Sequence, residues 1–227
     1  MESTESKILI GIALLAVGWL FGQGGKLYDE YRTRKRLKRQ LFEELKHIQN
    51  SLTMAHQDFL RTLQLSVHDV AELSTSQRFP HPIFENFYKD CCSNLNSSQR
   101  ESFDRIHQMI DAANRMFDQQ SDLAKVFCFG PSPEQKRWWR EMAKFQYLNI
   151  REIDYLIGHH LHNRKDPGIR FGEIAHRDYL KYSQQMDDEV RHGLEAAKQI
   201  NPKDAFVKYH PNMFPHLDDE ENNEDKG

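Results

Sequence analysis

The sequence has few cysteines, and their arrangement argues against the common cysteine-based sites. Three cysteines cannot form a closed disulfide framework, and the adjacent pair Cys91 and Cys92 has a spacing that rarely suits a structural bridge. There is no CxxC pair, so the usual zinc and thioredoxin patterns are absent. These features indicate a reducing compartment, in which the thiols pack as small apolar groups.

The sequence also lacks the motifs of the common catalytic sites. It contains no GxSxG elbow, no Walker loop, no GxGxxG and no HExxH. No internal repeat is present, and no alternating apolar and polar run has the length of a strand. The sequence therefore predicts an all-α fold that binds or senses rather than catalyses, with no cofactor.

An apolar segment stands near the start of the chain. Residues 8–22 carry no charge and, at about 1.5 Å per residue, would span about 22 Å as a helix, so crossing a bilayer requires help from the flanks. Lys7 and Lys26 can extend their ammonium groups outward and provide that help. We expect a single transmembrane helix over 8–25 after a short tail, 1–7, with the following side chains anchoring it: Ile8, Leu14, Trp19 and Phe21. A buried core helix or a cleaved export signal is the alternative.

The charge that follows this segment predicts its orientation. An export signal carries its positive charge before the apolar run, whereas here the basic cluster comes after it. Lys and Arg remain on the cytoplasmic side, which leaves 1–7 outside and the rest of the chain in the cytoplasm, most simply at a bacterial inner membrane. We expect anionic lipid headgroups, rather than nucleic acid, to meet the basic cluster: Arg32, Arg34, Lys35, Arg36, Lys38 and Arg39.

Glycines give the predicted membrane helix a face of small residues. Gly18 and Gly22 have GxxxG spacing, and Gly11 lies on the same stretch. Such a face permits close approach of a second helix, so one prediction is a homo-oligomer. The alternative is that glycine is simply common in membrane helices.

Helical periodicity continues through the remainder of the chain. Apolar residues at steps of three and four predict one long helix over 26–74, which packs on its own domain or, alternatively, forms a dimeric coiled coil. A helical domain over 75–209 follows and packs with it, and the whole forms a bundle of five or six helices. The last residues, 210–227, are acidic and poor in apolar groups, so we expect them to be disordered.

Helix boundaries inside this domain are marked by capping signals. Ser98 followed by Glu101 predicts a capping box at the start of a helix that runs to about residue 119. Ser132 and Pro133 predict the start of another helix, over 133–163, and a final helix is expected over 173–200.

The helix over 133–163 carries too many apolar residues for a surface helix, so it is predicted to be the central core element. We expect Phe145 to lie in that core. Of the adjacent Trp138 and Trp139, we expect one to be buried and the other half exposed, where it could mark a partner surface.

One cluster of histidines and carboxylates could bind a metal. His159 and His162 share a helix face, Glu152 lies one heptad earlier, and His176 begins the next helix. The repeated ExxH pattern of di-iron bundles is missing, and histidines near a helix C-terminus are common without a metal.

Three functions follow from these patterns. The favoured one is a membrane-anchored cytoplasmic interaction or sensing module with an unidentified protein partner. The alternatives are a metal-dependent bundle enzyme that uses the histidine cluster and an oligomerising effector that perturbs the membrane.

Overall fold

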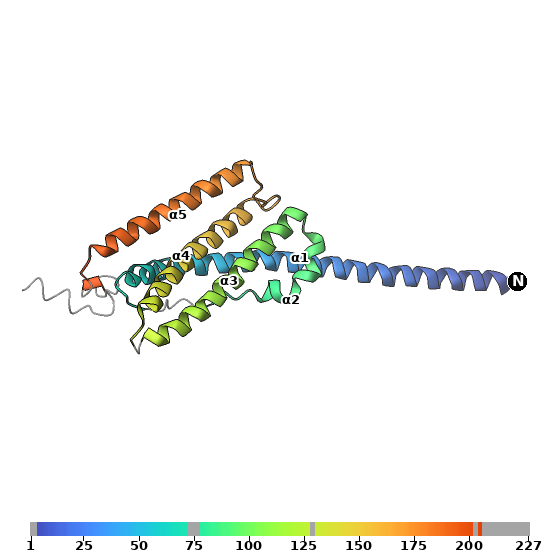
Figure 1. Cartoon of the computed structure of the whole chain (residues 1–227). Coiled ribbons are helices and arrows are strands. Elements are labelled where there is room, and N and C mark those ends of the chain that lie inside the picture. Colours follow the sequence, from blue (N-terminus) through green and yellow to red (C-terminus); the bar gives the residue numbers. More distant parts are fainter. Residues whose placement is uncertain (1–3, 72–77, 128–129, 202–203, 206–227) are drawn as a thin grey trace, which may run out of the picture. The chain divides into compact units, whose positions relative to one another are not determined.

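The structure, a computed structural model, describes residues 4–71, 78–127, 130–201 and 204–205, with side chains from residue 14 onward. The elements follow in chain order (Figure 1): α1 (Thr4–Ser66), α2 (Pro82–Cys91), the 3-10 helix η1 (Cys92–Asn94), α3 (Ser97–Phe127), α4 (Pro133–His162) and α5 (Ile174–Lys198). No strand occurs in the described ranges. The predicted all-α fold is confirmed, and the described ranges contain five α-helices, of which α1 alone covers both the predicted membrane helix and most of the long helix after it.

The chain divides into two compact units. The first unit comprises Met1–Glu44 and Pro82–Asn96, and the second comprises Leu45–His81 and Ser97–Gly227. Helix α1 contributes residues to both units. The predicted tail, 210–227, lies outside the described residues.

Helix α1 ends at Ser66, eight residues before the predicted end at residue 74. Asp69 adopts a left-handed backbone conformation with φ of 59°. The Val70 N–H then donates to the Leu65 carbonyl (3.3 Å), which satisfies a carbonyl of the last helical turn. Periodicity alone does not reveal this turn, because Val67 and Val70 continue the apolar spacing past the end of the helix.

The first unit has a small interior in which polar groups fix the short helix α2. Leu41 and Cys91 are fully buried, and burial raises the pKa of the Cys91 thiol to about 11, so it stays protonated. The Glu44 carboxylate accepts hydrogen bonds from the backbone N–H groups of Ile83 (2.6 Å) and Phe84 (3.0 Å) in the first turn of α2. A helix N-terminus favours a negative charge at this position.

The second unit has an apolar interior formed by the C-terminal part of α1 with α3, α4 and α5. Its largest fully buried side chains come from three of these helices: Phe59, Leu52 and Leu63 of α1, Phe103 and Ile110 of α3, and Trp139, Ile150 and Ile153 of α4. A Cβ added at Gly158 of α4 would meet the Gln49 side chain at 3.2 Å, and one at Gly193 of α5 would meet Leu60 at 3.9 Å. Side chains of α1 therefore pack against both α4 and α5.

The helix start predicted at Ser132 and Pro133 is confirmed, whereas the capping box predicted at Ser98 and Glu101 is wrong. At α4, the Ser132 hydroxyl accepts from Gln135 N–H (3.3 Å) and the Gln135 side chain accepts from Ser132 N–H (2.7 Å). Helix α3 already begins at Ser97, so Ser98 lies inside it, and its hydroxyl accepts from the Gly168 N–H (2.7 Å). The Ser98 hydroxyl thus bonds to a loop that is distant in sequence, whereas local spacing predicted that it would cap the helix.

Candidate functional site

The N-terminal part of α1 exposes an unusual amount of apolar surface. Phe21 is 78% exposed, and the other large apolar side chains from residue 14 to 31 are exposed as well: Leu14, Leu15, Val17, Trp19, Leu20, Leu27, Tyr28 and Tyr31. Three of the four predicted anchoring side chains, Leu14, Trp19 and Phe21, belong to this set. Ile8 lies outside the described side chains. Contiguous apolar surface of this kind marks an interaction site in a native protein.

Among the described residues, no helix is both long and apolar enough to cross a membrane. The predicted span, 8–25, begins outside the described side chains.

The six cations of the basic cluster fall into two sets: three have a hydrogen-bond or ion-pair partner, and the other three are called here the unengaged cations. Arg34 pairs with Glu30 (3.5 Å), Arg39 pairs with Glu43 (3.6 Å), and the Lys38 ammonium donates to the Asn94 carbonyl (2.9 Å). Within the described part of the chain, the other three cations have no carboxylate partner, and all three are exposed: Arg32, Lys35 and Arg36. The hydrogen bond from Lys38 to Asn94 joins α1 to η1 within the first unit.

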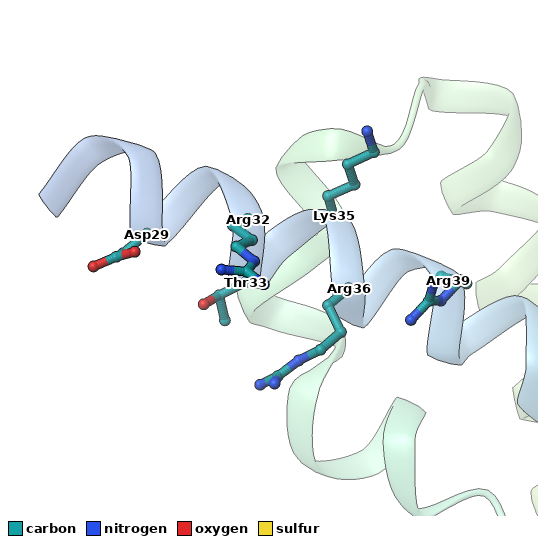
Figure 2. A pocket seen from close by; sticks show the side chains of 6 residues that line it. All are labelled: Asp29, Arg32, Thr33, Lys35, Arg36 and Arg39. Carbon is teal, nitrogen blue, oxygen red and sulfur yellow. The ribbon is translucent and has the colours of Figure 1, made fainter. Parts of the chain in front are cut away.

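The unengaged cations do not converge on one point. Together with Arg39, they line a hollow of about 700 Å³ beside Asp29 and Thr33. Figure 2 shows Lys35 and Arg36 leaving α1 in different directions. Cations that point in different directions can contact a layer of anions around the helix, whereas a single small anion would contact only one or two of them.

The structure gives the predicted metal ligands other partners. Tyr179 donates its hydroxyl to Glu152, and Arg105 also contacts this carboxylate at 3.1 Å. His159 accepts from the Asn163 amide at 3.1 Å, and burial lowers its pKa. His162 is exposed, and His176 packs against the Phe171 ring at 5.1 Å.

Glu152, His159, His162 and His176 do not form a metal-binding group in the described ranges, because no three of their donor atoms lie within 4.8 Å of one another. Of these residues, Glu152 of α4 instead joins α3 and α5, through Arg105 and Tyr179. The metal-site hypothesis gains no geometric support here.

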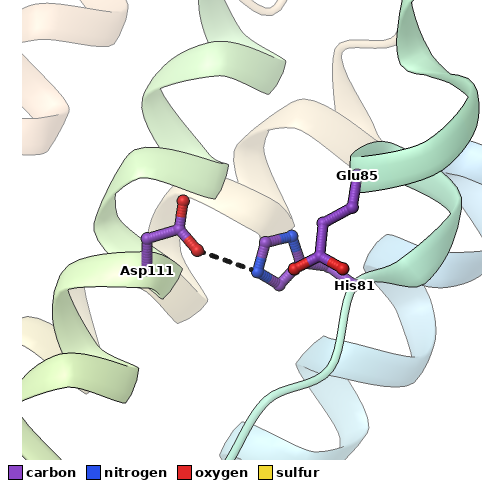
Figure 3. Close-up of side chains that lie close together, drawn as sticks. All are labelled: His81, Glu85 and Asp111. Carbon is purple, nitrogen blue, oxygen red and sulfur yellow. Dashed lines mark ion pairs between the residues drawn. The ribbon is translucent and has the colours of Figure 1, made fainter.

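Three other histidines, which the sequence analysis missed, are buried in the second unit. His81, His107 and His160 are at most 3% exposed. His81 Nε2 lies 3.1 Å from an Asp111 carboxylate oxygen (Figure 3). The His81 and His107 rings are 5.1 Å apart, and Phe103 contacts the His107 and His160 rings. His107 could have been found, because it falls four residues after Phe103 on the apolar stripe of α3.

One of these histidines lies beside a serine, as in a nucleophilic site. His160 Nδ1 is 2.7 Å from the Ser102 hydroxyl, which lines a hollow of about 160 Å³ with Arg105 and Gly168. Burial lowers the pKa of His160 to about 4. A general base works best with a pKa near the operating pH, so this ring is a weak base. The pair therefore fixes α3 to α4 rather than activating Ser102.

Helices α3 and α4 form an apolar groove, which we call the aromatic groove. Its volume is about 500 Å³, and its lining comes from both helices: Met116 and Gln119 of α3, and Trp138, Glu141, Met142, Lys144, Phe145 and Leu148 of α4. Trp139 is fully buried and Trp138 is 59% exposed, as predicted for this pair.

The prediction that Phe145 lies in the core is wrong, because its side chain is 59% exposed. Phe145 comes seven residues after Trp138, so both lie on one side of α4, whereas Trp139, Ile150 and Ile157 point into the core. Helix α4 is thus apolar on two adjacent sides, and the width of its apolar face does not reveal which side faces the core.

A second groove, the cationic groove, adjoins the first, because Glu141 and Lys144 line both. It measures about 340 Å³ and lies among the ends of α1, α4 and α5: its lining is Leu63, Ser66, Val67, Arg137, Arg140, Glu141, Lys144, Leu194 and Lys198. Across the described residues, none of its four cations forms an ion pair with a carboxylate.

The chain matches no family model, no curated protein and no solved structure.

Proposed function

We propose that this protein is a membrane-tethered helical module that works by binding a protein partner in the cytoplasm. In this proposal, residues 8–25 lie in the bilayer of a bacterial inner membrane, the tail 1–7 lies outside, and the helical units lie inside. The observation that carries it is the exposed apolar surface of α1 between Leu14 and Tyr31. Burying one such Leu or Phe side chain contributes about 1.5–3 kcal/mol, so the segment gains most from an environment that surrounds it.

The order of residues along α1 supports the same proposal. Trp19 lies near the end of the apolar stretch, Tyr28 and Tyr31 follow it, and the unengaged cations come next; the three rings suit the membrane interface. Arg32, Lys35 and Arg36 each contribute about 1 kcal/mol beside an anionic leaflet. Apolar, amphipathic and cationic side chains thus follow one another as the layers of a bilayer do.

Two features of the second unit favour binding over catalysis. The predicted metal ligand Glu152 is already hydrogen-bonded by Tyr179, and the histidine beside Ser102 has a pKa too low for a general base at neutral pH. A tethered binding module needs no such groups, because tethering raises its effective concentration toward partners at the membrane.

Fractionation and topology of the full chain test this proposal. We expect the protein to remain in the membrane pellet after washing with high salt and alkaline carbonate, which remove peripheral proteins. A cysteine introduced at the exposed position Met54 should react with a membrane-permeant thiol reagent in intact cells and resist an impermeant one. Release of the protein by carbonate, or labelling of position 54 from outside, would overturn the proposal.

The glycines of α1 support a second candidate function, an oligomerising effector. A Cβ placed at Gly18 or Gly22 would meet no atom within 4 Å, so this side of α1 is open to a second helix. Gly11 lies outside the described side chains. Gly18→Leu with Gly22→Leu should abolish cross-linked dimers in membranes, whereas the control Gly24→Leu should leave them unchanged.

A further inference from the structure

We infer that the C-terminal segment 206–227 of this same chain docks on the second unit, with apolar side chains in the aromatic groove and its acidic end against the cationic groove. The inference goes beyond the proposed function and does not depend on the membrane. It follows from four observations: the exposed aromatic side chains, the cations that form no ion pair within the described ranges, the composition of the segment and the place where the described chain ends.

The aromatic groove is built to take apolar side chains. Trp138 and Phe145 are each 59% exposed and face the same hollow as Met142 and Leu148. A volume of about 500 Å³ lies within the range of about 300–1,000 Å³ that is usual for ligand-binding clefts. Large aromatic groups left in water are the typical anchors of a binding surface.

The cationic groove sets the charge of the occupant. Arg137, Arg140, Lys144 and Lys198 oppose a single acidic side chain, Glu141. An occupant with apolar groups followed by several carboxylates would therefore match both grooves, because Lys144 stands on the rim of each. Complementary charge fixes the register of such a contact more than it adds affinity.

Segment 206–227 has this composition in this order. Its apolar side chains come first: Phe206, Val207, Tyr209, Met213, Phe214 and Leu217. Its carboxylates come second: Asp218, Asp219, Glu220, Glu221, Glu224 and Asp225. The segment also contains Pro211 and Pro215, and aromatic-lined grooves commonly bind proline-containing stretches.

The described chain ends where the segment would have to begin. Lys198, the last residue of α5, lines the cationic groove. After it, the Asn201 carbonyl accepts from the N–H groups of Asp204 and Ala205 (2.9 Å each), and Ala205 is fully buried. Residues 206–217 can span about 40 Å when extended, whereas α4 rises only about 15 Å from Trp138 to Leu148. The segment is therefore long enough to reach the aromatic groove and return to the cations.

Covalent connection favours this occupant over a second copy or a separate protein. A tether of this length keeps the segment at an effective concentration that a free partner reaches only near the millimolar range. A docked segment would cover Trp138 until a stronger binding partner displaced it. Such a partner would present aromatic side chains next to carboxylates, as the segment itself does.

Acrylamide quenching of the full-length protein tests the inference. In a Trp19→Phe background, Trp138 is the remaining tryptophan that quencher can reach without the segment, because Trp139 is buried. We expect Trp138 to be protected when the segment is intact. Changing the six carboxylates to Asn and Gln should remove that protection, and so should Phe214→Ala with Leu217→Ala. Comparison with a Trp138→Phe variant shows which part of the fluorescence comes from Trp138.

A charge swap separates docking from general misfolding. Arg137→Glu with Arg140→Glu and Lys144→Glu should remove the protection, and changing the six carboxylates of the segment to Lys in the same chain should restore it. The thermal unfolding midpoint of each variant controls for folding. If neither change to the segment alters quenching, or if protection depends on protein concentration, the groove has another occupant and the inference fails. Neither result bears on membrane fractionation.

Discussion

Two stretches of the same helix, α1, have opposite environments. From Leu14 to Arg36 every side chain is exposed, whereas from Leu37 onward a regular set is buried. Both stretches are rich in apolar residues. The difference lies in spacing: Leu14, Leu15, Val17, Leu20 and Phe21 cover all sides of the helix, while the buried set recurs every three or four residues and forms one face. A helix that is apolar on one face can bury that face against neighbouring helices. A helix that is apolar on all sides is buried only where an apolar environment surrounds it.

The largest expected effect compares phenylalanines from the two stretches. Phe59 is 1% exposed and Phe21 is 78% exposed. Phe59→Ala should lower the free energy of unfolding by about 3–5 kcal/mol, the usual effect of emptying a buried phenylalanine site. Phe21→Ala should change it by less than about 0.5 kcal/mol, as exposed substitutions do. Urea unfolding in mild detergent measures both, and a large effect of Phe21→Ala would mean that it packs within the protein.

A charge placed in the exposed stretch should change partitioning rather than folding. A charged side chain at the centre of a membrane helix costs about 2.5–3.5 kcal/mol on insertion scales. Leu15→Arg should therefore move the full chain from the membrane pellet toward the supernatant while its thermal unfolding midpoint stays unchanged. Leu15→Ile is the matched control. Retention of Leu15→Arg in the pellet after a carbonate wash would contradict the proposed anchor.

Acid should destabilise the packed stretch through the buried histidines. Burial, with His81 and His160 nearby, lowers the pKa of His107 to about 2, and burial lowers that of His160 to about 4. The unfolded chain, with histidine pKa values of about 6.5, binds these protons more readily, so stability is highest above about pH 6.5 and falls as the pH drops. His160 alone should account for roughly 3 kcal/mol between pH 6.5 and 4.

Urea unfolding at several pH values measures this loss. His160→Asn should flatten the dependence between pH 6.5 and 4, whereas His162→Asn, at an exposed position, should leave it unchanged. Equal slopes for the wild type and His160→Asn would show that His160 does not titrate in this way.

The smallest expected effect distinguishes the cations of the exposed stretch from one another. In a Leu15→Arg background, Arg32→Gln with Lys35→Gln should weaken binding to vesicles that contain anionic lipid by about 1 kcal/mol for each cation removed. Arg34→Gln with Arg39→Gln should weaken it less, because these two already pair with Glu30 and Glu43. Flotation at low and high salt measures both, and equal effects would contradict the division of the cluster.

Local signals predicted the helices well and the side-chain contacts poorly. The start of α4 follows from Ser132 and Pro133, since a cap depends only on residues three positions away. Phe145 was misplaced because α4 is apolar on two adjacent sides, and only its neighbours decide which side becomes buried. The histidine interior was missed for a similar reason, since Asp111 and Ser102 lie far along the chain from the rings they contact.

The carboxylate of Glu44 has a consequence for the order in which the chain folds. Helix α2 has ten residues, too few to persist as an isolated helix in water. Its first N–H groups are held by an acceptor 39 and 40 positions earlier in the chain. During synthesis Glu44 and its part of α1 emerge first, so α2 would become ordered by docking on a segment of α1 that is already present. On unfolding, its amide protons would be among the earliest to exchange with solvent.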